Sequence, residues 1–265
     1  MTSPQNTLLV LSPPRSCSTL IARMLWQHPA LTRYAMEPFD AVSTGEVSPE
    51  DALRAAATGR LLSALVDGKE RGSTGDGLLI KEITYQADPY FEALLRLTAR
   101  PVLFAMRDPR MTVRSRMRKF QEGGLPAIFP TEETGWRALH RQVGVCASRG
   151  IPYALVDGTL LQSDPARVAP LVFQALDLDF SKSLLSWQPV TAAEFGVGQG
   201  AHDYFFDQAM DSRGIEPPRD ETPDLESFPL EGGLRAHVRE CLQWYAELSK
   251  DDHCLKPKIR ADAEG

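Results

Sequence analysis

The sequence lacks a long apolar run, a cluster of cysteines and an excess of positive charge. No segment approaches the roughly 20 apolar residues of a membrane-spanning helix, and Met1–Pro14 lacks the basic region and apolar core of a signal peptide. The four cysteines are scattered without metal-ligand spacing, so neither disulfides nor a metal site is predicted. A formal net charge of −6 argues against binding to nucleic acid. These absences favour a cytoplasmic protein without metal, nucleic-acid or membrane partners.

The chain instead shows strands and helices in alternation. Short apolar runs predict strands at Leu8–Leu11, Leu31–Met36, Leu78–Lys81, Val102–Met106 and Tyr153–Val156. Helical periodicity predicts helices at Ser16–Gln27, Pro49 to about Val66, Asp88–Leu97, Pro109–Phe120, Thr131–Ser148, Pro165–Leu176 and Leu234–Leu248. This order predicts an α/β fold, with a central parallel sheet of about five strands flanked by helices on both faces. We expect one domain over residues 1–265, with residues 250–265 as a flexible tail.

The first chemical signal is the segment Pro13–Thr19, which reads PPRSCST and follows the first strand. It lacks the glycines and the lysine of an ordinary phosphate-binding loop. A helix that starts here presents unpaired N–H groups and a partial positive charge, and therefore suits an anion. Further donors come from Arg15, Ser16, Ser18 and Thr19. The alternative is that a serine only caps the helix while Arg15 is a solvated surface charge.

The second signal is Arg107, at the end of the strand Val102–Met106, followed eight residues later by Ser115 on a basic helix. Both side chains could bind one phosphate. The alternative is a basic surface helix in which Arg107 pairs with Asp108. The segment also superficially resembles the strand of a nucleotide hydrolase that ends in a metal-binding acid, but Arg107 intervenes before the acid.

Together the two segments resemble those of sulfotransferases that use 3′-phosphoadenosine 5′-phosphosulfate (PAPS), a branch of the P-loop superfamily. PPRSCST resembles their 5′-phosphosulfate loop, and RDPRMTVRS resembles their 3′-phosphate motif; the segments MEPF and LIKEITYQ also match members of the group. The resemblance implies a P-loop-type three-layer fold and transfer of a sulfuryl group from PAPS to a hydroxyl or amine of a small-molecule acceptor, which releases PAP without a metal. It implies cofactor binding by Arg15, Ser16, Cys17, Ser18, Thr19, Arg107 and Ser115.

The sequence departs from that family at several positions. Cys17 replaces the usual loop glycine and therefore needs a negative φ or a strained backbone. Leu20 stands where the family often has an aromatic residue that stacks on adenine. The segment Lys81-Glu82-Ile83 lacks the family's catalytic histidine. A late phosphate-binding loop is matched only by Arg213 and Gly214, which we expect to lie over the 3′-phosphate.

The candidate catalytic residues are Arg15, Lys81 and Glu37. Arg15 and the loop N–H groups would stabilise the leaving group, assisted by Lys81. Glu37, next to Pro38 and Phe39, is the first choice for the general base, and an ion pair with Arg15 or a helix cap is its alternative role. Glu82 and His28 are the other candidate bases, and His202 could line the acceptor pocket.

Two other functions remain open from the sequence. A P-loop kinase or nucleotide hydrolase needs a loop lysine and a magnesium-binding acid, and arginines stand in those places here. A non-catalytic protein of the same fold that binds PAP is the second alternative, because the loop glycine and the histidine are missing. The sequence predicts neither the acceptor's identity nor the oligomeric state.

Overall fold

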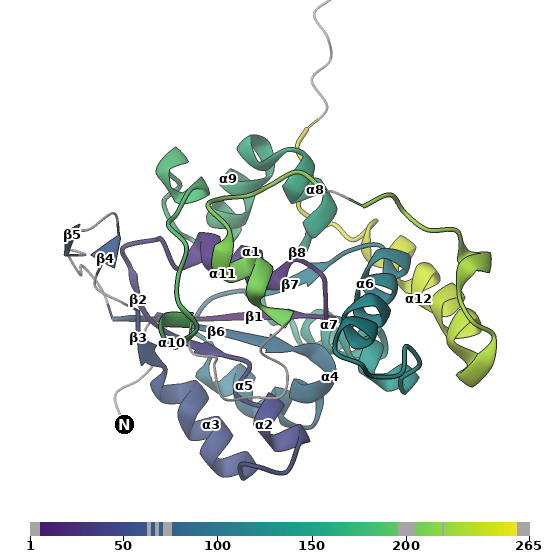
Figure 1. The fold of residues 1–265 in the computed structure, drawn as a ribbon. Coiled ribbons are helices and arrows are strands. Elements are labelled where there is room, and N and C mark those ends of the chain that lie inside the picture. Colours follow the sequence, from purple (N-terminus) through teal and green to yellow (C-terminus); the bar gives the residue numbers. More distant parts are fainter. Residues whose placement is uncertain are drawn as a thin grey trace, which may run out of the picture.

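The computed structural model describes residues 6–62, 65–66, 69–70, 76–195, 205–218 and 220–258. Its centre is a six-stranded sheet with the order β3-β2-β6-β1-β7-β8 (Figure 1). The strands are β1 (Thr7–Ser12), β2 (Leu31–Met36), β3 (Arg60–Leu61), β6 (Gly77–Ile83), β7 (Val102–Met106) and β8 (Tyr153–Asp157). A separate two-stranded sheet pairs β4 (Leu65–Val66) with β5 (Lys69–Glu70).

The five predicted strands are confirmed, and all of them pair in parallel. The sixth strand, β3, adds to β2 at the edge in antiparallel orientation. The prediction of a helix from Pro49 to about Val66 is therefore wrong in its second half. The helix α3 ends at Thr58 because Gly59 follows with a φ of 61°, and a Cβ there would lie 2.4 Å from Leu78 Cδ1.

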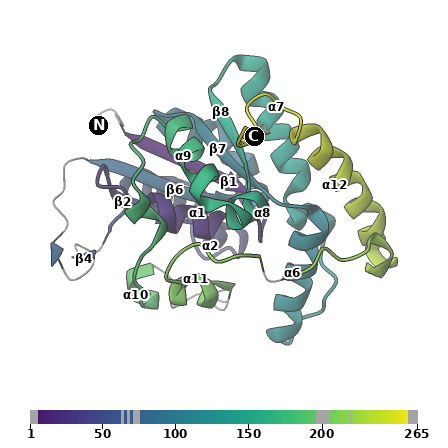
Figure 2. The same cartoon turned by 90° about the horizontal axis from the view of Figure 1, so that it is seen from above.

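Helices cover both faces of the sheet (Figures 1 and 2). The longer ones are α1 (Ser18–Leu25), α3 (Pro49–Thr58), α5 (Phe91–Leu97), α6 (Pro109–Glu122), α7 (Trp136–Arg149), α9 (Pro165–Ala175) and α12 (Leu234–Leu248). The shorter ones are α2 (Asp40–Ser43), α4 (Thr84–Ala87), α8 (Gly158–Ser163), α10 (Ala192–Phe195) and α11 (Asp207–Asp211). None of the helices within the described residues is long and apolar enough to cross a membrane.

The alternation of side chains along β1 explains the hydrophobic cores on the two faces of the sheet. Leu8 and Val10 belong to a core that includes α1 and α9, whereas Leu9 and Leu11 belong to a core that includes α3, α5 and α7. Successive side chains of a strand point to opposite faces, so a strand that is buried on both sides is apolar throughout. The uninterrupted apolar run in the sequence is the direct result.

Two other segments differ from the prediction. The predicted helix Thr131–Ser148 is divided, because a 3₁₀ turn at Thr131–Thr134 is followed by Gly135 with a φ of 74° before α7 begins. The start of the predicted flexible tail is instead held against β8, since the Leu155 N–H bonds to the His253 carbonyl at 3.0 Å and the Leu255 N–H to the Leu155 carbonyl at 2.8 Å. Residues 259–265 lie outside the described residues.

The parallel strands bring their carboxyl ends to one edge of the sheet. There the loop Pro13–Thr19 after β1, Glu37 after β2, Ile83 at the end of β6 and Arg107 after β7 lie close together. Ligands of open α/β sheets bind at this edge. The topology alone thus gathers most of the residues that the sequence singled out.

Candidate active site

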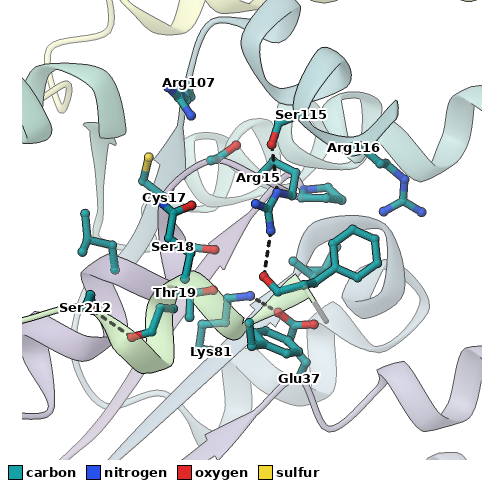
Figure 3. Close-up of a pocket in the computed structure, with 18 of the residues that line it drawn as sticks. Arg15, Cys17, Ser18, Thr19, Glu37, Lys81, Arg107, Ser115, Arg116 and Ser212 are labelled. Atoms are coloured by element: carbon teal, nitrogen blue, oxygen red, sulfur yellow. Dashed lines mark hydrogen bonds and ion pairs between the residues drawn. The ribbon is translucent and has the colours of Figure 1, made fainter. Parts of the chain in front are cut away.

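A cavity of about 410 Å³ lies at the carboxyl edge of the sheet. This volume is within the range of small-molecule binding sites. Its walls come from the loop after β1, the ends of β2 and β6, the second half of α6, and residues within 205–217 together with Asp220. Figure 3 shows part of this lining. It is lined by nearly all the predicted site residues, namely Arg15, Ser16, Cys17, Ser18, Thr19, Glu37, Lys81, Arg107, Ser115 and Gly214.

The loop before α1 is strained at Arg15 and Cys17, which have φ values of 65° and 63°. Glu37, with a φ of 46°, also lines the cavity, and these are three of the four non-glycine residues with positive φ in the described chain. Such a conformation costs about 1–2 kcal/mol per residue and is concentrated at functional sites. Cys17 therefore keeps the backbone of the missing glycine at an energetic cost.

Gly158, at the start of α8, packs directly against this loop. A Cβ at Gly158 would lie 2.8 Å from both the Ser16 carbonyl oxygen and the Cys17 Cβ. On the same side, the Cys17 thiol donates to Gln162 Oε1 at 3.2 Å. The shape of the loop therefore depends on the absence of a side chain at residue 158.

We expect Gly158→Ala to lower the free energy of unfolding by about 1–3 kcal/mol, because the loop must move away from the new methyl group. The affinity for PAP, the nucleotide implied by the sequence resemblance, should fall with it. Chemical denaturation and calorimetric titration measure the two effects. Gly144→Ala is the matched control, since a Cβ there meets no atom within 4 Å and alanine favours the interior of α7 by about 1 kcal/mol. Equal behaviour of the two variants would contradict this role of Gly158.

Arg15 extends into the cavity and connects two walls. Its Nε donates to Ser115 Oγ at 3.1 Å, and its Nη1 donates to the Phe205 carbonyl at 3.0 Å (Figure 3). Burial lowers the pKa of the guanidinium below its ordinary value, and the nearby charge of Arg107 acts in the same direction. A bound anion would relieve both effects.

Arg107 is not paired with Asp108, which was one reading of the sequence. Asp108 instead accepts from the Arg110 backbone N–H at 2.8 Å and binds the Arg110 guanidinium at 2.7 Å. The buried Arg107 Nε and the buried Ser16 Oγ have no hydrogen-bond partner within the described part of the chain. Buried polar groups of this kind are rare and need an explanation. An anionic ligand at the cavity end formed by these residues would supply it.

Glu37 forms an ion pair with Lys81, and not with Arg15 as one alternative proposed (Figure 3). The Lys81 side chain is 2% exposed and that of Glu37 is 13% exposed. The pairing follows from the sheet, because Met36 is in register with Lys81 and the Glu37 N–H donates to the Lys81 carbonyl at 2.8 Å. A carboxylate and an ammonium group thus lie together at the cavity wall.

The other candidate bases occupy different places. Glu82 is fully buried and accepts from the Phe39 and Ile83 N–H groups at 2.8 and 2.7 Å. Burial, together with the charge of Glu37, raises the pKa of Glu82 to about 8. His28 Nδ1 accepts from the Ala30 N–H at 3.2 Å. Among the described residues, neither Glu82 nor His28 lines the cavity, and His202 lies outside the described residues.

The segment with Arg213 and Gly214, predicted to be a late phosphate-binding loop, matches that prediction only in part. Gly214 lines the cavity, but the Arg213 guanidinium donates to Gln188 Oε1 at 3.1 Å and is not among the described lining residues. The cavity is also lined by residues that the sequence did not single out, namely Gln162, Ser212 and Glu216. They come from short or irregular segments without periodicity, so no sequence signal pointed to them.

Part of the cavity wall is aromatic and polar. Tyr85, Gln86 and Phe120 line it together with Arg116. The Arg116 guanidinium lies 4.8 Å from the centre of the Phe120 ring and forms an ion pair with Glu133. Across the described residues, no group of three His, Cys, Asp or Glu side chains is placed to hold a metal ion.

Solved structures share this fold. The chain is similar to the sulfotransferase domain of the olefin synthase of Synechococcus PCC 7002, with a TM-score of 0.54 and 18% identity over 92% of this chain and 96% of that domain. It is also similar to the sulfotransferase domain of the curacin biosynthetic pathway, with a TM-score of 0.56 and 17% identity over 92% of this chain and 99% of that domain. No family profile and no curated protein matches the sequence. At these identities the similarity establishes the fold.

Proposed function

We propose that this protein is a sulfotransferase that transfers the sulfuryl group of PAPS to a hydroxyl or amine of a small-molecule acceptor. The observation that carries the proposal is the convergence of Arg15, Arg107 and Ser115 in one cavity with the Lys81–Glu37 pair at its wall. The shared fold with two sulfotransferase domains supports it. Fold alone does not define function, so the proposal depends on the chemistry of the site.

The residues present fit a nucleotide with two separate anionic groups. The Arg107 Nε, which has no hydrogen-bond partner among the described residues, would bind the 3′-phosphate together with Ser115, which lines the same cavity. The N–H groups at the start of α1, with Ser16 Oγ and Arg15, would bind the 5′-phosphosulfate. Because Arg15 already contacts Ser115, the two anion sites share one wall.

The Lys81–Glu37 pair supplies the remaining chemistry of the proposed reaction. The acceptor oxygen or nitrogen forms a bond to sulfur while the bond between sulfur and the bridging oxygen breaks, and the electron pair stays on the 5′-phosphate of PAP. Lys81 and Arg15 stabilise the negative charge on that phosphate, and Glu37 takes the acceptor's proton. The sulfuryl group carries less charge than a phosphoryl group, so positioning and these cations suffice.

The positions of the two arginines argue against a kinase or a nucleotide hydrolase. Arg15 stands in the loop where such proteins need a lysine, and Arg107 follows β7 where they need a metal-binding acid. A nucleotide with a 3′-phosphate would give Arg107 an anion to bind, whereas ATP has no phosphate at that position. The response of the protein to PAP and to ATP therefore distinguishes a sulfotransferase from a kinase or nucleotide hydrolase.

We expect PAP to stabilise the protein without magnesium. A ligand at a hundred times its dissociation constant adds about 2.7 kcal/mol of stability, which corresponds to a rise in Tm of roughly 5–10 °C for a domain of this size. ATP with magnesium should raise the Tm by much less, because it lacks the 3′-phosphate. Differential scanning fluorimetry measures both responses.

The reverse outcome would overturn the proposal. Stabilisation by ATP with magnesium and none by PAP would favour a kinase or hydrolase. Stabilisation by PAP without turnover of PAPS, tested with a panel of alcohols, phenols and amines, would favour the non-catalytic alternative.

A further inference from the structure

Glu82 is a buried carboxylate that the proposed chemistry does not use. It is 0% exposed, and none of the ion pairs found within the described residues includes it. Lys81 and Glu82 are neighbours on β6, so their side chains point to opposite faces of the sheet. Lys81 therefore reaches the cavity, whereas Glu82 points into the protein interior below the turn that carries Glu37.

Both side-chain oxygens of Glu82 accept from backbone N–H groups, one in the turn after β2 and the other at the end of β6. Oε2 accepts from the Phe39 N–H at 2.8 Å, and Oε1 accepts from the Ile83 N–H at 2.7 Å. The first bond holds the turn that follows β2, and the second holds the end of β6. A single side chain thus joins the turn of Glu37 to the strand of Lys81.

The turn needs such a restraint. Glu37 has a φ of 46°, which is unfavourable for a residue with a Cβ. The backbone bond from the Glu37 N–H to the Lys81 carbonyl fixes the start of the turn. Its far end is fixed by the bond from Phe39 to Glu82 and by the Phe39 ring, which stacks on Tyr90 with 4.6 Å between the ring centres.

We propose that Glu82 is a positioning residue that sets the Glu37 carboxylate beside Lys81 at the cavity wall. It acts through the backbone of the turn and does not touch the substrate. The carboxyl group is buried without an ion-pair partner among the described residues, and its two N–H bonds offset part of the cost of burying it. The role in turnover rests on the proposed sulfotransferase function, whereas the restraint on the turn does not.

The first test uses the protein without a ligand. Amide hydrogen exchange at Phe39 should be about ten- to a hundredfold faster in Glu82→Ala than in the wild type, as expected when a buried N–H group loses its hydrogen-bond partner. Glu82→Gln keeps one acceptor oxygen and is the variant to use if the alanine variant does not fold. Unchanged exchange at Phe39 in a folded variant would overturn the proposal, whatever the activity.

The second test separates positioning from general destabilisation. Turnover of PAPS should fall at least tenfold in Glu82→Gln, while the calorimetric affinity for PAP stays within about twofold, because the phosphate-binding residues follow β1 and β7. Thr134→Val is the matched control, since it removes a buried hydrogen bond to His237, and neither residue is among the described residues that line the cavity. Its turnover should remain at the wild-type level.

The two tests separate the possible failures. Equal losses of turnover and PAP affinity in Glu82→Gln, or a similar loss of turnover in Thr134→Val, would show that Glu82 is merely structural. If the wild type neither binds PAP nor turns over PAPS, the proposed function fails, and the exchange rate at Phe39 alone decides whether Glu82 holds the turn.

Discussion

Arg107→Ala should weaken PAP binding by about ten- to more than a hundredfold, the value of one or more charged hydrogen bonds to phosphate. Adenosine 5′-phosphosulfate lacks the 3′-phosphate, so its affinity should change only slightly. The reason for expecting a large effect is that the buried Nε of Arg107 has no hydrogen-bond partner in the part of the chain that the structure describes. Calorimetric titration with both nucleotides measures the difference.

Two further variants make this comparison sharper. Arg114→Ala removes an equal charge from α6, the helix that follows Arg107, but its side chain bonds to Ser227 outside the cavity, so PAP affinity should remain near the wild-type value. Arg15→Ala should weaken the binding of both nucleotides, because Arg15 is assigned to the 5′-phosphate group that they share. If Arg107→Ala and Arg114→Ala bind PAP equally well, Arg107 has no role at a 3′-phosphate.

The sheet and the two loops that carry Arg15 and Arg107 were predictable because they follow from short patterns in the sequence. The strand before Arg15 and the strand before Arg107 are short apolar runs that end at a turn, and parallel pairing places both turns at one edge. The strand β3 was missed because Arg60 and Leu61 carry no alternating pattern of their own. Its existence depends on Gly59, which ends α3 and turns the chain toward β2.

The partners within the site were less predictable because they depend on register. The pairing of Glu37 with Lys81 follows from the alignment of Met36 with Lys81 across two strands that are more than 40 residues apart in sequence. The sequence showed both residues as candidates but offered Arg15 as the partner of Glu37. Likewise, no local pattern indicates that the Phe205 carbonyl accepts from Arg15.

Glu37→Gln should lower turnover by about 10²–10⁴, the usual value of a positioned general base. The amide keeps the shape of the side chain, and its oxygen can still accept from Lys81, so PAP affinity should change little. The measurement is turnover of PAPS at saturating cofactor together with calorimetric titration of PAP. Asp88→Asn is the matched control, because it weakens an ion pair with Arg141 away from the cavity and should preserve turnover.

The dependence on pH separates the base from a structural carboxylate. A base must lose its proton before it can act, so turnover should rise with pH on the acidic side, and Glu37→Gln should abolish that rise. Glu82→Gln should lower turnover but keep the rise, because Glu82 positions the turn without contacting the acceptor. If the rise persists in Glu37→Gln and disappears in Glu82→Gln, then Glu82 is the base. If Glu37→Gln loses stability and PAP affinity together, Glu37 serves only to neutralise the buried Lys81.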